Sequence, residues 1–514
     1  MFPARLHRAI YIVLVTLLGG CMVCSTWAAN LVWVLLAANW LLEGRWREKW
    51  QMARHSRMLA AYATLCLVLL VGMLWTSNSA TGWSQLRTKL PLLVVPLVML
   101  TSRPLEGRVR SAVLWLYAAT VLVVSLIATV RMLAIPDMPY RDAVPYISHI
   151  RFALNCCMVI FIAVGTYRWP HRSSLWPLTV LRWLAVLWMV VFVLLIRSYT
   201  ALAVIVAVSL ALLLVYYRRW PLMALWCAVM GVATLSVVHE VRSYYRPVPL
   251  AVEPLRETTV AGRPYEHACD GIVENGNYIN NYVCRPELRT AWTLRSTLPY
   301  DSLTSGGFPV EPTLIRYLNA CGLAKDSVGV CSLSAADIAA VERGVANPVY
   351  ESGSPLRKMV YVMALEHEYY RHTHAIRGFS MLQRIELWRA TWRVVTEHPA
   401  FGVGTGDIYD AVQDQLAAMD SELYGSYKNT HNQYLSLMAM VGLLGFIAVA
   451  AMFLRAVLPR MAKPRTSLPP LMMAWMLTVL ISFLTEDTLN TLAGILLCTW
   501  FLAARSEKFD NATQ

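Results

Sequence analysis

Long apolar runs recur along the whole chain, and they restrict its fold more than any other feature. A helix that spans a bilayer needs about 20 predominantly apolar residues, because the hydrocarbon layer is about 30 Å thick. About twelve runs approach this requirement. Only 15% of the 514 residues are charged and 57% are hydrophobic, which excludes a disordered chain and a cytosolic globule. The runs lie near residues 9–26, 28–43, 58–76, 89–101, 111–134, 151–167, 174–196, 199–217, 221–239, 432–454, 468–484 and 488–504.

The positions of Lys and Arg predict which side of the membrane each loop faces. Cytoplasmic loops of membrane proteins carry an excess of these residues, and here cations precede the first run and then occupy alternate loops. Both termini are therefore expected in the cytoplasm. The same bias explains the net charge of +14, so we expect no nucleic-acid partner. The cations in this register are Arg5, Arg8, Arg45, Arg47, Lys49, Arg54, Arg57, Arg103, Arg108, Arg110, Arg168, Arg172, Arg218, Arg219, Arg455, Arg460, Lys463, Arg465, Arg505 and Lys508.

This topology divides the chain into three parts. We expect an N-terminal bundle of about nine helices over residues 1–239 and a large outward-facing loop domain over residues 240–431. About three more helices and a short cytoplasmic tail follow over residues 432–514. The predicted fold is thus an all-α polytopic membrane protein with about 12 transmembrane helices. Its one large loop, between helices nine and ten, is expected to be mainly helical.

The helical patterns of the loop begin at Glu311. The first half is rich in Gly, Pro and Asn and should be mostly irregular. Helices are expected over Glu311–Asn319 and over Ser334–Arg343, the latter with Ser334 as N-cap. From Pro355 to about residue 397, apolar residues recur every three or four positions. Arg384 lies at the margin of this stripe, where it can reach a cleft between loop and helices. The stripe consists of Leu382, Ile385, Trp388, Trp392 and Val395.

Four of the eleven cysteines lie in the loop. In an oxidising compartment they suggest two disulfides, for which three connectivities are possible. We favour the local pairs, Cys269 with Cys284 and Cys321 with Cys331. A zinc site is the alternative, but the spacings do not form paired C-x-x-C knuckles. We therefore expect no metal.

Several cations break the charge pattern at the outer interface. A ring of cations there needs an anionic partner, and a lipid-linked diphosphate is a natural candidate, because Arg matches phosphate geometry and stays charged when partly desolvated. Anchoring to lipid head groups is the alternative, and it explains one or two such residues more easily than six. These cations are Arg87, Lys89, Arg131, Arg141, Arg151 and Arg197.

A polar segment opens the tenth apolar run at the same interface. It includes His431, Asn432 and Tyr434, and the stretch from Lys428 to Gln433 is polar although the helix behind it is apolar. An ordinary loop end with a helix cap is the alternative interpretation. An imidazole here could instead serve as a proton acceptor near neutral pH.

Two groups of motifs resemble a known family. One is His431-Asn432-x-Tyr434-Leu435 followed by Gly442-Leu443-Leu444-Gly445. The other is Arg384-x-x-x-Trp388 followed by His398-Pro399-x-x-Gly402-x-Gly404-x-Gly406. Together they resemble the bacterial O-antigen ligase and polymerase family, whose relatives include pilin-type O-oligosaccharyltransferases. The segments Tyr146–Arg151 and Glu486–Asn490 resemble one branch of it.

The resemblance implies a glycosyltransferase of the bacterial inner membrane that is metal-independent, GT-C-like and without a cofactor. Such an enzyme moves a glycan from an undecaprenyl-diphosphate carrier to an acceptor hydroxyl at the periplasmic face. An O-antigen ligase acting on the lipid A-core oligosaccharide is the preferred interpretation. A polysaccharide polymerase or a protein O-oligosaccharyltransferase is the alternative within the family.

The resemblance also assigns roles to single residues. The essential His of the family corresponds to His431, and its loop Arg corresponds to Arg384. Its hairpin Arg corresponds to Arg197, although the family reads Ser-Arg-small where this chain has Arg197-Ser198-Tyr199. We expect His431 to orient or deprotonate the acceptor, and the two Arg to hold the diphosphate during an inverting displacement. Further candidates for binding the diphosphate or the acceptor are Arg87, Lys89, Arg151, His149, Asn432 and Tyr434.

Two other classes of membrane protein compete with this interpretation. A transporter or lipid flippase usually shows internal repeats and broken helices near the middle of the membrane. The chain shows no repeat between its halves, and only the fourth run is interrupted by proline in its middle. A structural scaffold would leave the cations at the outer interface unexplained.

Overall fold

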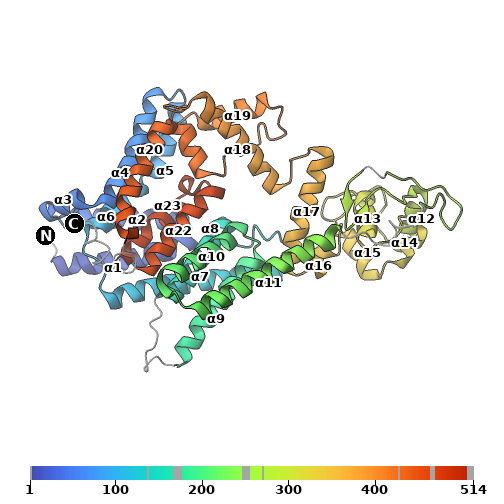
Figure 1. Ribbon diagram of the computed structural model, residues 1–514, viewed down its shortest axis with the longest axis horizontal. Coiled ribbons are helices and arrows are strands. Elements are labelled where there is room, and N and C mark those ends of the chain that lie inside the picture. Colours follow the sequence, from blue (N-terminus) through green and yellow to red (C-terminus); the bar gives the residue numbers. More distant parts are fainter. Residues whose placement is uncertain are drawn as a thin grey trace. The chain divides into compact units, whose positions relative to one another are not determined.

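The computed structural model describes residues 3–135, 138–165, 176–245, 255–268, 271–426, 429–462 and 469–505. The fold is that of an all-α polytopic membrane protein (Figure 1). Within the described residues, strands are confined to a hairpin of β1 (Val273–Glu274) and β2 (Asn277–Tyr278). Contacts divide the chain into two compact units, one of residues 1–224 and 384–514 and the other of residues 225–383.

The N-terminal part of the first unit is built from the predicted apolar runs. Polar side chains mark the helix starts, since Ser25, Ser56 and Ser198 each accept a hydrogen bond from a backbone N–H of the first turn. The elements are α1 (Ala4–Cys24), α2 (Thr26–Leu42), α3 (Trp46–His55), α4 (Arg57–Val71), η1 (Gly72–Trp75), α5 (Ser79–Lys89), α6 (Pro91–Thr101), α7 (Gly107–Ala134), α8 (His149–Gly165), α9 (Trp176–Leu195), α10 (Tyr199–Leu212) and η2 (Leu213–Tyr217).

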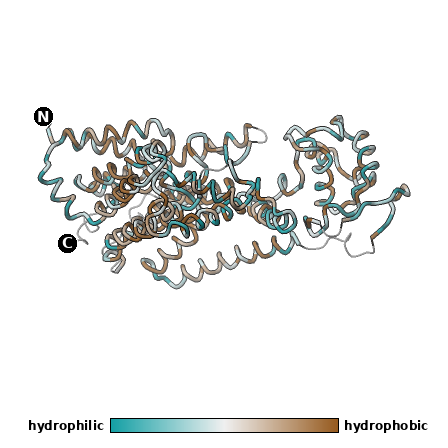
Figure 2. The backbone as a smooth tube through the Cα atoms, turned by 90° about the horizontal axis from the view of Figure 1, so that it is seen from above, coloured by the Kyte–Doolittle hydropathy of each residue, from teal (hydrophilic) through white to brown (hydrophobic). Residues whose placement is uncertain are grey.

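The C-terminal part of the chain completes this unit. Helix α20 packs against α4, and α22 packs against α8 and α10, so that the end of the chain lies among its early helices. Figure 2 shows that the hydrophobic colour recurs along many of the helices. The elements are α18 (Ser380–Glu397), α19 (Ile408–Ala418), α20 (Gln433–Ala462), α22 (Pro470–Thr485), η4 (Thr488–Asn490), α23 (Leu492–Thr499) and η5 (Trp500–Ala504).

The predicted membrane character is confirmed by helix length and composition. Among the described residues, six helices are long and apolar enough to cross a membrane, and five shorter apolar helices accompany them. Each predicted run lies largely in helical segments over its described residues. The fourth forms α6 with Pro96 inside it, and the last is divided among η4, α23 and η5. In lipid a helix satisfies its own backbone hydrogen bonds, which is why such runs fold as helices.

The second unit contains most of α11 and the part of the large loop that precedes residue 384. Its core gathers around Trp292, Leu314 and Val341, and a turn with positive φ at Asn275 and Gly276 joins its two strands. The helices predicted over Glu311–Asn319 and Ser334–Arg343 are confirmed by α13 and α15. The elements are α11 (Trp220–Tyr245), α12 (Arg285–Arg295), α13 (Val310–Ala320), α14 (Ser327–Ser332), α15 (Ala335–Glu342), α16 (Val349–Ser352) and α17 (Pro355–Thr373).

The predicted disulfide between Cys321 and Cys331 is not formed in this structure. Both thiols are free and exposed. Cys321 follows the last turn of α13, and Cys331 lies in the separate short helix α14. Cys284 is free and buried where α12 begins. Cys269 lies outside the described residues, so its pairing with Cys284 stays a prediction.

Helix α20 is interrupted at Gly442, and the Gly-rich segment Pro399–Gly406 fills the interruption. Gly442 has φ 67° and ψ 178°, which is not helical. The carbonyls of Ala439 and Met440 accept hydrogen bonds from the N–H groups of Val403 and Gly404, at 2.9 and 3.0 Å. In return, the N–H groups of Leu443 and Leu444 donate to the carbonyls of Pro399 and Ala400, at 2.8 and 3.3 Å. Irregular backbone at membrane depth is tolerated where protein satisfies it in this way.

Glycine is required where these two segments meet. A Cβ on Gly402 would lie 2.4 Å from the Ala439 carbonyl oxygen, and a Cβ on Gly442 would lie 2.2 Å from that of Ala400. Both obstacles are backbone atoms, which cannot rotate away. The segment Pro399–Gly406 is therefore the part of the chain that holds α20 in its broken form.

Candidate active site

Helix α18 presents two side chains to the same region. Arg384 and Trp388 lie four residues apart, so they share one face of the helix. The Arg384 Nη2 group donates to Glu486 Oε1 at 2.6 Å, and the Trp388 Nε1 group donates to the His431 carbonyl oxygen at 3.2 Å. This arrangement gives a physical reason for the Arg-x-x-x-Trp spacing. Trp388 fixes the backbone of His431, while Arg384 binds Glu486, which lies beside the His431 imidazole.

His431 lies in a tight turn just before α20. Its φ is 54°, in the left-handed region that non-glycine residues seldom adopt. The Asp487 carboxylate stabilises the turn, because it accepts hydrogen bonds from the His431 N–H at 2.8 Å, the Thr430 hydroxyl at 2.8 Å and the Ser436 hydroxyl at 2.7 Å. Strained backbone of this kind persists only where its surroundings hold it, and it is common at functional sites.

Asn432 and Tyr434 support the structure beside His431. The Asn432 side-chain oxygen accepts from the N–H groups of Tyr434 and Leu435, at 3.0 and 3.1 Å, so Asn432 caps α20. The Tyr434 hydroxyl donates to the Leu480 carbonyl at 2.9 Å. Asn432 is buried, and both side chains are committed to these contacts. The predicted binding role of each stays a prediction.

Glu486 lies between the imidazole and the guanidinium group. Its carboxylate is 6% exposed and is 4.0 Å from His431 Nδ1, beyond hydrogen-bonding distance. Burial raises the pKa of Glu486, against the opposing effects of Arg384 and Arg151. Burial, helped by the charges of Arg384 and Arg151, lowers the pKa of His431, although Asp487 opposes this. These effects favour the neutral imidazole, which is the form that can accept a proton.

Arg151 approaches the same pair of carboxylates from α8. Its Nη2 group lies 3.5 Å from the Asp487 carbonyl oxygen. Its Nε–H is buried and has no hydrogen-bond partner among the described residues. A buried donor without a partner is costly, and a bound anion at this position would satisfy it.

Arg197 contacts an aromatic ring at the border of this region. Its guanidinium lies over the Tyr140 ring, 4.9 Å from the centroid, and that ring contacts the His149 ring edge-on at 5.8 Å. Arg197 also has a positive φ of 51°. Its hairpin lies beside the end of α22, because the Thr200 and Thr485 hydroxyls are 2.7 Å apart. Arg197 and His149 thus border the site, and no contact within the described chain joins either to His431.

Lys89 and Arg87 differ in their surroundings. Lys89 is 2% exposed, and its Nζ donates to Gln85 and, at 3.1 Å, to the Asn490 side chain. Lys89 therefore contacts the segment that begins at Glu486. Arg87 is exposed in the last turn of α5, and no hydrogen bond or ion pair within the described chain connects it to the cluster.

Sequence reasoning assigned no role to Glu486 and Asp487, which join most of these groups. The available signal was a pair of adjacent carboxylates between two apolar runs, because ionisable residues at such places are rare and usually functional. No group of three or more His, Cys, Asp or Glu side chains in the described part of the chain is placed to hold a metal ion.

The comparison with known families agrees with the motifs. A family model described as O-antigen ligase matches residues 343–450. The matched stretch contains Arg384, the segment Pro399–Gly406 and His431, and it confirms the resemblance seen in the sequence. No curated protein matches the chain.

Proposed function

We propose, on the premise that residues 343–450 are an O-antigen ligase domain, that this multi-pass membrane protein transfers a glycan from a polyprenyl diphosphate to an acceptor hydroxyl. We further propose that it is an O-antigen ligase of the inner membrane with lipid A-core oligosaccharide as acceptor. On this proposal both termini are cytoplasmic and the site faces the periplasm, as the distribution of cations favours.

The observation that carries the proposal is the set of donors around Glu486. Arg384 donates to the buried Glu486 carboxylate, and Arg151 Nη2 lies 3.5 Å from the backbone carbonyl oxygen of the next residue, Asp487. One of their N–H groups, Nε of Arg151, lacks a partner among the described residues. A diphosphate supplies several acceptor oxygens and negative charge, and Arg binds such groups bidentately, through two parallel hydrogen bonds.

Glu486 gives Arg384 a partner when no diphosphate is bound. Only one of the five N–H donors of the guanidinium is needed for the 2.6 Å bond. The remaining donors can bind a phosphate oxygen while the carboxylate keeps the side chain in place. Arg384 then stabilises the negative charge that develops on the departing diphosphate. Such electrostatic stabilisation is usually the largest single contribution to catalysis.

His431 acts on the acceptor in this proposal. Its Nδ1 faces Glu486, so Nε2 is the nitrogen left for the acceptor hydroxyl. The acceptor oxygen attacks the anomeric carbon, a new carbon–oxygen bond forms, and the bond from that carbon to the phosphate oxygen breaks. The proton of the hydroxyl passes to Nε2, and the bonding electrons leave with the polyprenyl diphosphate. Attack from the face opposite the leaving group inverts the anomeric centre.

The break in α20 does not favour a transporter. Transporters use broken helices to expose backbone groups to a substrate or ion. Here the freed carbonyls of Ala439 and Met440 and the N–H groups of Leu443 and Leu444 are all bonded to Pro399–Gly404.

Deletion of the gene, followed by analysis of surface glycans, tests the proposal. We expect core lipid without long chains, together with accumulated lipid-linked polymer. Core bearing one repeat unit would instead indicate a polymerase, and unchanged lipid with unglycosylated secreted protein would indicate an oligosaccharyltransferase. Glycans and glycoproteins unchanged from the wild type would contradict glycan transfer altogether.

A further inference from the structure

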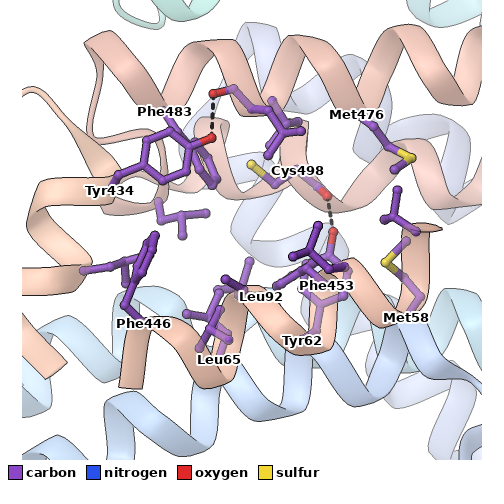
Figure 3. A pocket seen from close by; sticks show the side chains of 18 of the residues that line it. Met58, Tyr62, Leu65, Leu92, Tyr434, Phe446, Phe453, Met476, Phe483 and Cys498 are labelled. Carbon is purple, nitrogen blue, oxygen red and sulfur yellow. Dashed lines mark hydrogen bonds between the residues drawn. The ribbon is translucent and has the colours of Figure 1, made fainter. Parts of the chain in front are cut away.

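An apolar groove runs along α20 in the first unit. Its volume is about 310 Å³, and residues of α4, α6, α22, η4 and α23 form the rest of its wall. Figure 3 shows Tyr434, Phe446 and Phe483 at one end and Met58 and Met476 at the other. The groove therefore extends from the start of α20, three residues after His431, on both sides of the break at Gly442.

The wall of the groove offers a ligand almost no hydrogen bonds. The Tyr62 hydroxyl donates to the Cys498 carbonyl at 2.6 Å, and the Tyr434 hydroxyl donates to the Leu480 carbonyl at 2.9 Å (Figure 3). The Trp475 indole donates to the Leu497 carbonyl at 2.7 Å. Since these polar groups already have partners, the space suits a hydrocarbon chain.

One end of the groove adjoins the candidate site. Leu489, which lines it, follows Asp487 by two residues, and its N–H donates to the Gln433 side chain at 2.8 Å. At the outer rim, Leu454 and Leu480 are 53% and 48% exposed. A chain whose head group lies at Arg384 and His431 can therefore enter the groove beside Tyr434 and leave it between α20 and α22.

We propose that this groove binds the isoprenoid units next to the diphosphate of the donor lipid. This inference rests on the proposed function, because the diphosphate bound at Arg384 and Arg151 would place the chain at the Tyr434 end. The volume is at the lower limit of ligand pockets, so it holds only the first part of a long polyprenyl chain. The rest of the chain passes out over Leu454 and Leu480 into the bilayer.

Donors of graded chain length test the groove in the purified full-length protein. We expect the KM of the wild type to fall as the lipid is extended from ethyl to longer isoprenoids, and then to level off. Ala450→Trp fills the groove and should raise the KM of isoprenoid donors about tenfold, equivalent to two buried methylene groups. The KM of the ethyl donor should not change, because that lipid does not reach Ala450.

Ile447→Trp is the matched control, because Ile447 is on the same helix, is 59% exposed and does not line the groove. It should keep the chain-length dependence. If Ala450→Trp does not fold, Val479→Trp on α22 replaces it, with exposed Leu484→Trp as its control. Equal KM profiles for a groove variant and its control would overturn the inference while leaving glycan transfer intact.

Photolabelling separates this inference from the proposed function. A diazirine-bearing polyprenyl diphosphate should label groove peptides of α20 and α22, and unlabelled polyprenyl diphosphate should compete whereas phosphatidylethanolamine should not. Such labelling of a preparation that transfers no glycan would support the groove and count against the proposed function. Equal competition by phosphatidylethanolamine would show that an ordinary membrane lipid occupies the groove, and would overturn the inference.

Discussion

Gly442→Ala should destabilise the protein at the point where α20 is interrupted. The backbone of Gly442, at φ 67° and ψ 178°, lies in a region that essentially only glycine adopts, and forcing another residue into it costs about 2 kcal/mol. The new Cβ would also lie 2.2 Å from the Ala400 carbonyl oxygen. The segment Pro399–Gly404 must therefore move away from α20.

The size of the effect follows from the hydrogen bonds at the break. Four backbone bonds join the two segments, and each contributes about 1 kcal/mol. Loss of two of them, added to the backbone cost, lowers the free energy of unfolding by about 4 kcal/mol. Because the same segment continues from α18, we also expect slower glycan transfer through displacement of Arg384 relative to His431.

Reversible unfolding in mixed micelles of mild detergent and SDS measures this change. Gly231→Ala is the control, because Gly231 is a glycine of the apolar helix α11 and a Cβ there meets no atom within 4 Å. It should leave stability unchanged or raise it by up to about 1 kcal/mol. Wild-type stability and turnover in Gly442→Ala would refute the assigned role of the break.

Two further predictions concern the charged groups of the site. Arg384→Lys should lower kcat about tenfold, because a point charge replaces the guanidinium fork poorly, and Arg384→Gln should lower it about 100-fold or more, because an amide supplies no charge. Equal rates for Arg384→Gln and the wild type in a purified transfer assay would rule out the role of Arg384 in stabilising the diphosphate. In the pH profile of kcat/KM, the acid limb should lie below the ordinary imidazole pKa, because burial and the charges of Arg384 and Arg151 disfavour the protonated form of His431. Arg151→Gln removes one of these charges, so the pKa of His431 should rise and the acid limb should shift to higher pH; a shift to lower pH would contradict this electrostatic account.

The fold was largely predictable because its main signal is local. The apolar runs fold mainly as helical segments, since lipid leaves the backbone few other ways to satisfy its hydrogen bonds. The break in α20 was not predicted, because it depends on hydrogen bonds between the residues around Gly442 and the distant segment Pro399–Gly404. A Gly in an apolar run is compatible with an intact helix as well.

The site was predictable in part. The motifs placed Arg384, Trp388 and His431 in one region, and the structure joins them through Glu486 and through the His431 backbone. The sequence did not indicate the role of Glu486 and Asp487, because they follow His431 by more than 50 residues and their pairing depends on how α22 packs. It also did not separate Lys89, which contacts Asn490, from exposed Arg87.

The most direct test of the account is transfer by His431→Ala, compared with His398→Ala, in purified protein with a lipid-linked donor. The His431 side chain is 27% exposed, and its imidazole makes no hydrogen bond within the described part of the chain, since Glu486 Oε1 is 4.0 Å from Nδ1. Its removal should therefore leave thermal stability nearly unchanged. We predict that kcat falls by at least about 100-fold in His431→Ala and stays at the wild-type value in His398→Ala, whose side chain is exposed. Wild-type turnover in stably folded His431→Ala would contradict the assignment of the imidazole as the group that prepares the acceptor.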